Sequence, residues 1–268
     1  MKNRTKTFVI GDVHGRRAQL RLLVEMLPRD VATDTLVLLG DLIDRGEDAP
    51  GVVEDVLGWQ REAAQRVIVL RGNHEQMLLD LIDEGSILWL HPAAGGERTF
   101  EQYVGKPPLA VIEQDLEAVR AEIVRTVPPE HIEFFRRMPL YYEDVYALYV
   151  HAGLENGKHP RDTDEQHLLW VRNTDFFRHY RGKPCVFGHT PTQFLPLFGR
   201  LVHHGIYINH SAIGIDTGYT YSSPLSCLEL PSFMLYQAFS DGRTLKHQIT
   251  TFVSEPLRLM RKTIGARS

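Results

Sequence analysis

Five short apolar stretches of this sequence each lead into a glycine and a side chain that can bind a metal ion. The clearest is residues 36–46, Leu-Val-Leu-Leu-Gly-Asp-Leu-Ile-Asp-Arg-Gly. Its first half is rich in branched apolar residues, as in a strand that is buried on both faces. Asp41, Asp44 and Arg45 follow within a few positions. Taken alone, the stretch is typical of either a functional site or a turn with a surface ion pair.

The same pattern recurs at four other places along the chain, which favours the functional site. These places, with their ligand-type residues, are 8–15 (Asp12, His14), 67–75 (Asn73, His74), 146–153 (His151) and 185–191 (His189). Glycine permits tight turns and a close approach of the backbone to a ligand. Because sites in α/β sheets are built where the strands end, we expect these five segments to meet along one edge of a sheet.

The composition is that of an ordinary globular protein. The chain has 268 residues, of which 43% are hydrophobic and 24% charged, enough for one large domain or for one domain with an insertion. A net charge of -4 argues against a general binder of nucleic acid or of acidic membranes. No run reaches the ~18 apolar residues of a membrane span, so we expect a cytoplasmic protein without a membrane partner.

The two cysteines do not suggest a disulfide framework. Cys185 and Cys227 both lie within strand-like runs, where a cysteine commonly acts as a small buried apolar residue. We therefore expect both to be buried, which fits a reducing compartment.

The first third of the chain alternates between predicted strands and helices, which indicates a parallel sheet with helices on its faces. After Tyr141 the sequence becomes rich in strand-like runs. Predicted strands are 7–10, 35–39, 67–70, 145–150, 184–187, 206–209 or 213–216, 225–230 and 233–239, and predicted helices are 16–27, 49–65 and 75–84.

This alternation breaks between about residues 86 and 139. The segment contains a Gly95–Gly96 pair and helical patterns at 109–124 and 129–137, separated by paired prolines. We interpret it as a helical cap that is inserted between two ligand-bearing strands and either borders the site or adds a packed layer. The expected organisation is a single domain over 1–250 with the cap at about 86–139, followed by a solvated tail at 251–268.

The chemistry of the ligand-type residues points to divalent metals. Aspartate, histidine and asparagine together suit Mn, Fe or Zn better than a thiolate site does. Two ions ~3.5–4 Å apart need a shared ligand, and a carboxylate has two oxygens to share. Asp41 could bridge in this way, and such a pair of ions lowers the pKa of a bound water to near neutral.

In their order and spacing, residues 11–15, 40–46 and 72–75, with His151 and His189, resemble the signature of the phosphoprotein phosphatase branch of calcineurin-like metallophosphoesterases. The resemblance covers about residues 8–192. Residues 71–77, 169–172, 188–191 and 215–218 further resemble the small bacterial and bacteriophage serine/threonine phosphatases. The resemblance implies an α/β fold, a β-sandwich of mixed sheets flanked by helices, with the cap inserted.

The resemblance also implies two divalent metal ions, expected to be Mn, with Fe and Zn as alternatives. The implied ligands are Asp12, His14 and bridging Asp41 for one ion, and Asp41, Asn73, His151 and His189 for the other. The remaining implied site residues are Arg45, Arg172 and Asn73 for binding phosphate, His74 for protonating the leaving group, and Asp44 for orienting His74.

Three functions are compatible with this pattern. The first is a serine/threonine protein phosphatase that hydrolyses phosphoproteins by in-line attack of a metal-activated hydroxide. The second is a dinucleoside polyphosphate (tetraphosphate) hydrolase, and the third is a catalytically silent metal-binding scaffold. The 169–172 and 71–77 matches favour the first, and an intact acid and arginine clamp argue against the third.

Two nearby acidic residues have simpler interpretations. We expect Glu75 to favour the start of its helix through the helix dipole, with support of the metal ligands as a lesser alternative. Asp216 precedes Gly218 and is expected to shape a turn rather than to bind a metal.

Overall fold

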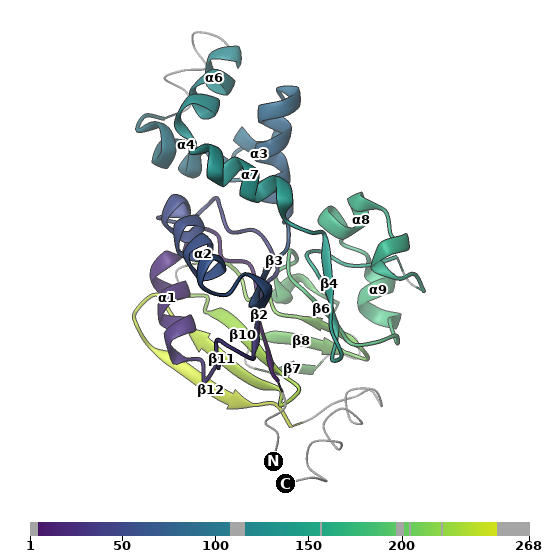
Figure 1. Cartoon of the computed structure of the whole chain (residues 1–268). Helices are drawn as coiled ribbons and strands as arrows, with labels where there is room; N and C mark the ends of the chain where they lie inside the picture. Colours follow the sequence, from purple (N-terminus) through teal and green to yellow (C-terminus); the bar gives the residue numbers. More distant parts are fainter. Residues whose placement is uncertain are drawn as a thin grey trace.

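Two six-stranded sheets pack face to face and carry helices on their outer faces (Figure 1). The computed structural model describes residues 5–107, 116–155, 157–196, 201–203, 205–220 and 222–250. The predicted tail at 251–268 lies outside these residues. The fold is the mixed β-sandwich flanked by helices that the sequence predicts, and that prediction is confirmed.

The first sheet has the strand order β12-β11-β10-β1-β2-β3. Its strands are β1 (Thr7–Ile10), β2 (Thr35–Leu38), β3 (Val67–Val69), β10 (Leu225–Leu230), β11 (Met234–Ala238) and β12 (Thr244–Gln248). The pairs β1–β2 and β2–β3 are parallel, as predicted, but β10 joins β1 antiparallel and β11 and β12 continue antiparallel. The sheet is therefore mixed, because the last strands return to its edge from the far end of the chain.

The second sheet has the strand order β4-β5-β6-β9-β8-β7. Its strands are β4 (Tyr141–Glu143), β5 (Leu148–Val150), β6 (Cys185–Phe187), β7 (Leu201–His203), β8 (Ile206–Asn209) and β9 (Ala212–Gly214). The two runs that the sequence offered as alternatives, 206–209 and 213–216, both contribute strands and pair with each other as β8 and β9.

Most helices cover the outer faces of the two sheets. Against the first sheet lie α1 (Arg17–Met26) and α2 (Ala49–Ala63), and beside the second lie α8 (Glu165–Trp170) and α9 (Thr174–His179). In the described part of the chain, three short 3₁₀ helices also lie outside the cap, namely η1 (Ala64–Arg66), η3 (Pro160–Asp162) and η4 (Thr192–Phe194). Helix α3 (Asn73–Glu84) begins two residues before the predicted start, so Asn73 and His74 belong to its first turn.

Burial on both faces explains why the ligand-bearing strands are apolar without alternation. In β1, Phe8 and Ile10 pack against the helices, whereas Val9 faces the second sheet. In β5, Tyr149 faces the first sheet, and its neighbours Leu148 and Val150 pack towards α8 and α9. Each strand therefore sits between two apolar layers, which holds its end rigidly in place.

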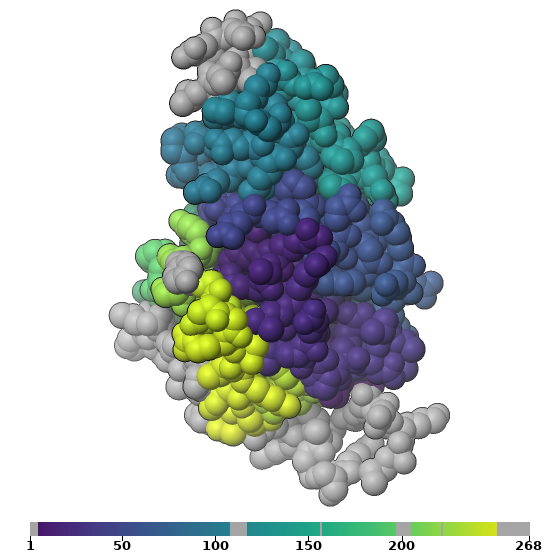
Figure 2. Space-filling view, turned by 90° about the vertical axis from the view of Figure 1, so that its left-hand side faces the viewer, coloured from purple at the N-terminus to yellow at the C-terminus, as the bar shows by residue number. Residues whose placement is uncertain are grey.

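The cap stands above the sheets beside α3, as Figures 1 and 2 show in teal. Its described elements are η2 (Ile87–Leu90), α4 (Gly96–Val104), α6 (Leu116–Thr126) and α7 (Pro129–Arg137). The sequence predicted α7 with these bounds, whereas α4 was missed because it starts in the Gly95–Gly96 pair. Trp89 and Phe100 belong to the same buried cluster as Phe8, so the cap shares the core of the first sheet.

Both cysteines are free and buried, as predicted. Within the described ranges, no helix is long and apolar enough to cross a membrane.

Candidate metal centre

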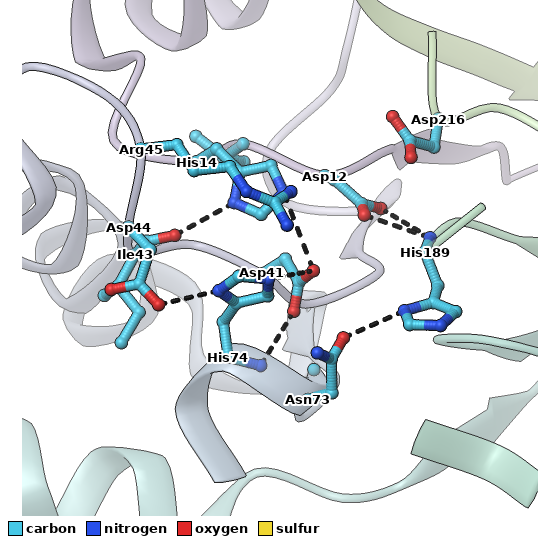
Figure 3. Close-up of polar contacts among 12 residues, drawn as sticks. Asp12, His14, Asp41, Ile43, Asp44, Arg45, Asn73, His74, His189 and Asp216 are labelled. Carbon is cyan, nitrogen blue, oxygen red and sulfur yellow. Dashed lines mark hydrogen bonds and ion pairs between the residues drawn. The ribbon is translucent and has the colours of Figure 1, made fainter. Parts of the chain in front are cut away.

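The predicted ligands meet in one buried site, although they come from two sheets rather than from one (Figure 3). Asp12 and Asp41 follow β1 and β2 of the first sheet, whereas His151 and His189 follow β5 and β6 of the second. We expected one sheet edge, and that expectation was wrong. Face-to-face packing brings the carboxyl ends of the two sets of strands together, which periodicity along the chain cannot reveal.

Asp41 is the centre of this arrangement. Its Oδ2 lies 3.7 Å from Nε2 of both His14 and His74, and its Oδ1 lies 3.4 Å from Nε2 of His151. The Oδ1 atom also accepts the backbone N–H of His74 at 3.1 Å. Burial alone would raise the pKa of Asp41, whereas positive charge on the surrounding imidazoles, His151 first and then His74, lowers it below its usual range. Because the pKa of His151 is itself lowered and that of His74 is raised, His74 is the ring that supplies this charge. Asp41 is therefore placed and charged as a bridging ligand would be.

Backbone carbonyls fix the protonation of three histidines. Nδ1 of His14 lies 3.0 Å from the carbonyl oxygen of Ile43, and Nδ1 of His151 lies 2.8 Å from that of Leu39. Nε2 of His189 lies 3.2 Å from a third carbonyl oxygen. Because a carbonyl only accepts, each of these nitrogens carries the proton. The other ring nitrogen then presents a lone pair, which is the arrangement that ligating histidines use.

Four atoms that can bind a metal converge around Asn73. Its Oδ1 lies 2.9 Å from Nε2 of His151 and 2.9 Å from Nδ1 of His189, and Oδ1 of Asp41 is close by. Burial lowers the pKa of both histidines, so the rings are neutral and these nitrogens are acceptors. A buried group of acceptors needs a cation, and nitrogen and oxygen donors suit Mn, Fe or Zn. These residues therefore fit a divalent metal.

Asp12 lies beside His189, in surroundings that disfavour its charged form. Both of its oxygens accept the backbone N–H of His189, at 3.0 and 3.1 Å. Burial, then the charges of Asp216 and Asp41, raise its pKa well above the usual value. Asp216 accepts the N–H of Gly218 at 2.8 Å, which confirms the predicted turn, but its buried carboxylate also points towards Asp12 (Figure 3). A cation would relieve the repulsion among these carboxylates.

His74 can be placed in the site in two ways. Its ligand atoms, with those of His14 and Asp41, lie within 4.8 Å of one another, so geometry alone would allow it to bind a metal. However, its Nδ1–H donates to Oδ2 of Asp44 at 2.6 Å. Although burial lowers its pKa, Asp41 and Asp44 raise it above the ordinary value overall. A protonated imidazole cannot be a ligand, so this balance favours a proton carrier.

The two arginines affect different histidines of the site. Nη1 of Arg45 donates to Nε2 of His14 at 2.6 Å, and its guanidinium lies 4.5 Å from the ring centroid of Tyr219. Metal binding by His14 would require this guanidinium to turn away. Arg172 is exposed. Burial is the main cause of the lowered pKa of His151 and His189, and the positive charge of Arg172 adds a smaller effect in the same direction. Arg45 thus contacts the site directly, whereas Arg172 acts on it only through its charge.

The site residues hold unusual backbone conformations. The φ angle is positive, in the left-handed region, at His14 (47°), Asp41 (49°), Asp44 (72°), Arg45 (65°) and His189 (61°). Such conformations are unfavourable for residues other than glycine and persist where the surrounding structure imposes them. Here the rigid strands and the contacts of the site impose them.

Sequence reasoning undervalued Glu75 and missed Trp89, Thr99 and Tyr219. Glu75 is fully buried, and its carboxylate accepts four backbone N–H groups, from Asp41 (3.0 Å), Leu42 (2.7 Å), Ile43 (3.3 Å) and Gly72 (2.9 Å). Burial and the charge of Asp41 raise its pKa to about 7. It therefore joins two ligand loops, which is more than the expected effect on the helix dipole.

The family assignment follows from comparison with known proteins. Residues 5–213 match the calcineurin-like phosphoesterase family. Serine/threonine-protein phosphatase 1 of Salmonella typhimurium is 41% identical over 90 residues, 33% of this chain and 39% of that protein. A symmetrical bis(5'-nucleosyl)-tetraphosphatase of Coxiella burnetii is 31% identical over 156 residues, 58% of this chain and 44% of that protein. The chain thus spans less than half the length of these two relatives.

A crystal structure described as a candidate diadenosine tetraphosphatase shares the fold, with a TM-score of 0.59 and 20% identity over 93% of this chain and 96% of that one. The chain belongs to the calcineurin-like phosphoesterase family. Members of this family use a dinuclear divalent metal centre, for which the buried donor groups described above offer ligands.

Replacing Glu75 with Gln should destabilise the fold. The amide NH₂ would face two of the four buried N–H donors, and each unsatisfied buried donor costs about 1–3 kcal/mol. We expect the free energy of unfolding, from urea titration, to fall by about 2–4 kcal/mol. The exposed Glu62→Gln is the control and should stay within about 0.5 kcal/mol of the parent. A loss below about 1 kcal/mol in Glu75→Gln would contradict the joining role.

Replacing Asp41 with Asn should weaken both metal positions at once, because Asp41 contacts both groups of donors. In the parent protein, we expect a chelator to abolish activity and added Mn²⁺ to restore it. In Asp41→Asn, we expect the affinity for Mn²⁺ to fall by at least roughly 100-fold, which is more than the loss of a residue that only supports a ligand usually causes. Elemental analysis after dialysis measures the bound metal, with the exposed Asp241→Asn as control. Two ions retained in an active Asp41→Asn variant would rule out the bridge.

Proposed function

We propose that this chain is a metal-dependent phosphomonoester hydrolase that acts on phosphoserine and phosphothreonine in proteins. The observation that carries the proposal is the buried His74–Asp44 pair, with a 2.6 Å bond that aims the remaining ring nitrogen of His74 towards Asp41. Serine and threonine leave as alkoxides, which are strongly basic and need a proton as the bond breaks. A buried, protonated imidazole beside the metal ligands supplies that proton.

Each predicted site residue then has a role. Two divalent ions, held by Asp12, His14, Asp41, Asn73, His151 and His189, would supply the nucleophile from water and polarise the phosphoryl group. Arg45 and Arg172 would bind phosphoryl oxygens, since a guanidinium offers two parallel donors, and Asn73 would assist them. His74 would protonate the leaving oxygen, and Asp44 would keep the ring in place. No covalent phosphoenzyme is needed.

A symmetrical dinucleoside tetraphosphate hydrolase is the second candidate, and the relatives favour it about as well. The Coxiella burnetii protein named above carries that name over a longer matched stretch than the phosphatase does. Its reaction would break a phosphoanhydride, whose leaving group is already acidic and depends less on His74. A silent metal-binding scaffold is disfavoured because it has no use for an acid or for arginines.

A direct comparison of substrates tests the proposal. With Mn²⁺ supplied, we expect phosphoserine and phosphothreonine peptides and p-nitrophenyl phosphate to be hydrolysed. Bis-p-nitrophenyl phosphate should be poor, because its second ester group would occupy an oxygen that the arginines bind. The values of kcat/KM for a phosphopeptide and for diadenosine tetraphosphate are the measurement. A clear preference for the tetraphosphate or the diester would replace the phosphatase proposal with the second candidate.

Replacing His74 with Asn separates a proton carrier from a metal ligand. We expect bound Mn²⁺ to stay at the parental level while kcat/KM for an alkyl phosphate falls roughly 10²–10⁴-fold. The loss should be much smaller for p-nitrophenyl phosphate, whose leaving group scarcely needs a proton. The control is His210→Asn, because His210 pairs with Arg181 away from the site. Loss of metal, or equal losses on both substrates, would count against the acid role.

A further inference from the structure

The cap holds the loop that carries Asp44 and Arg45. The indole N–H of Trp89, in η2, donates to both carboxylate oxygens of Asp44, at 3.0 and 2.9 Å. The hydroxyl oxygen of Thr99, in α4, accepts the backbone N–H of Asp44 at 2.8 Å. The carbonyl of Gly95 accepts the backbone N–H of Arg45 at 3.2 Å. Two cap elements therefore bind the residue that orients His74 and the residue next to it.

The Gly95–Gly96 pair makes this close approach possible. Gly95 has a φ of 77°, and a Cβ there would lie 2.7 Å from Cγ of Arg45. A Cβ on Gly96 would lie 2.3 Å from the carbonyl oxygen of Trp89 and 2.7 Å from its indole ring. A larger residue at Gly95 would press on Arg45 in the loop, and one at Gly96 would displace Trp89 within the cap. Gly95 is thus explained by its contact with the loop, and Gly96 by the close packing of Trp89, the residue that reaches Asp44.

We propose that Trp89 is a positioning residue for protonation of the leaving group, so that the cap acts on the reaction through Asp44 and His74. This inference rests on the proposed function, because it assumes that His74 is the acid. The His74 ring hydrogen-bonds to Oδ2 of Asp44, whereas the indole N–H of Trp89 lies within hydrogen-bond distance of both oxygens.

The physical reason is the softness of the aspartate side chain. The last torsion of an aspartate is broad and only weakly restricted by its own geometry. Rotation about this bond would carry Oδ2 away from Nδ1 of His74 and tilt the imidazole. Trp89 and Asp44 are both fully buried, so water cannot replace the indole N–H. Hydrogen bonds to charged groups are stronger than those between neutral groups, so loss of the indole N–H leaves the carboxylate free to turn.

Trp89→Phe removes the N–H and keeps an aromatic ring in the core. We expect unchanged Mn²⁺ content, a small change in KM, and a loss of kcat/KM on the order of 10-fold for an alkyl phosphate. The loss for p-nitrophenyl phosphate should be below about threefold, because that substrate depends little on the acid. Trp59→Phe is the matched control, since Trp59 is half-buried in α2 away from the site, and it should leave both rates unchanged.

A double-variant cycle separates this role from simple packing. If Trp89 acts through His74, adding Trp89→Phe to His74→Asn should cost little further activity. Equal losses on both substrates, or a full extra loss in the double variant, would overturn the inference and leave the proposed function intact. If His74→Asn itself shows no dependence on the leaving group, the acid role fails first, so the two failures are distinguishable.

A second pair of variants decides the case if Trp89→Phe does not fold. Thr99→Val removes the acceptor for the Asp44 N–H with little change of shape, and Thr99→Ser keeps it. A loss selective for alkyl phosphate in Thr99→Val, with near-parental rates in Thr99→Ser, is the result expected if the cap positions Asp44. Equal losses on both substrates in Thr99→Val would show that the cap contributes packing alone.

Discussion

The geometry of the site depends first on one buried carboxylate, that of Glu75. It accepts backbone N–H groups from the loop after β2 and from Gly72 before α3. These bonds hold the loop that carries Asp41 against the helix that carries Asn73 and His74. Without an acceptor there, several buried donors would lack partners, at about 1–3 kcal/mol each. The left-handed conformations of Asp41 and Asp44 persist because this loop cannot relax.

Near these Glu75 contacts, backbone carbonyls determine which ring nitrogen of each predicted histidine ligand carries the proton. Carbonyls orient His14, His151 and His189. The second ring nitrogens of His151 and His189 face Asn73, and that of His14 lies near Asp41 and accepts from Arg45. The same burial that lowers the pKa of His151 and His189 raises that of Asp12. Both shifts have one cause, since a low-dielectric interior disfavours any unpaired charge. A divalent cation could bind these imidazole nitrogens and carboxylate oxygens together.

The cap links this site to the outer layer of the fold. Its apolar side chains share a core with the first sheet, so its position is fixed by the same packing that holds the strands. Trp89 and Thr99 extend that rigidity to Asp44 through three hydrogen bonds. An inserted segment that would otherwise serve as a packed layer is therefore in direct contact with a residue that orients the proposed acid.

The sequence by itself determined which side chains can bind metal and where along the chain they stand, because each follows its own apolar strand and glycine within a few residues. It also determined most strands and helices near the site, since their periodicity is local. Only the tertiary structure decided that two sheets, not one, carry the predicted ligands, that Glu75 joins two loops, and that Trp89 reaches Asp44. These contacts join residues 32 to 45 positions apart or lie across two packed sheets. Periodicity reports which face of an element is buried, but not which distant element covers it.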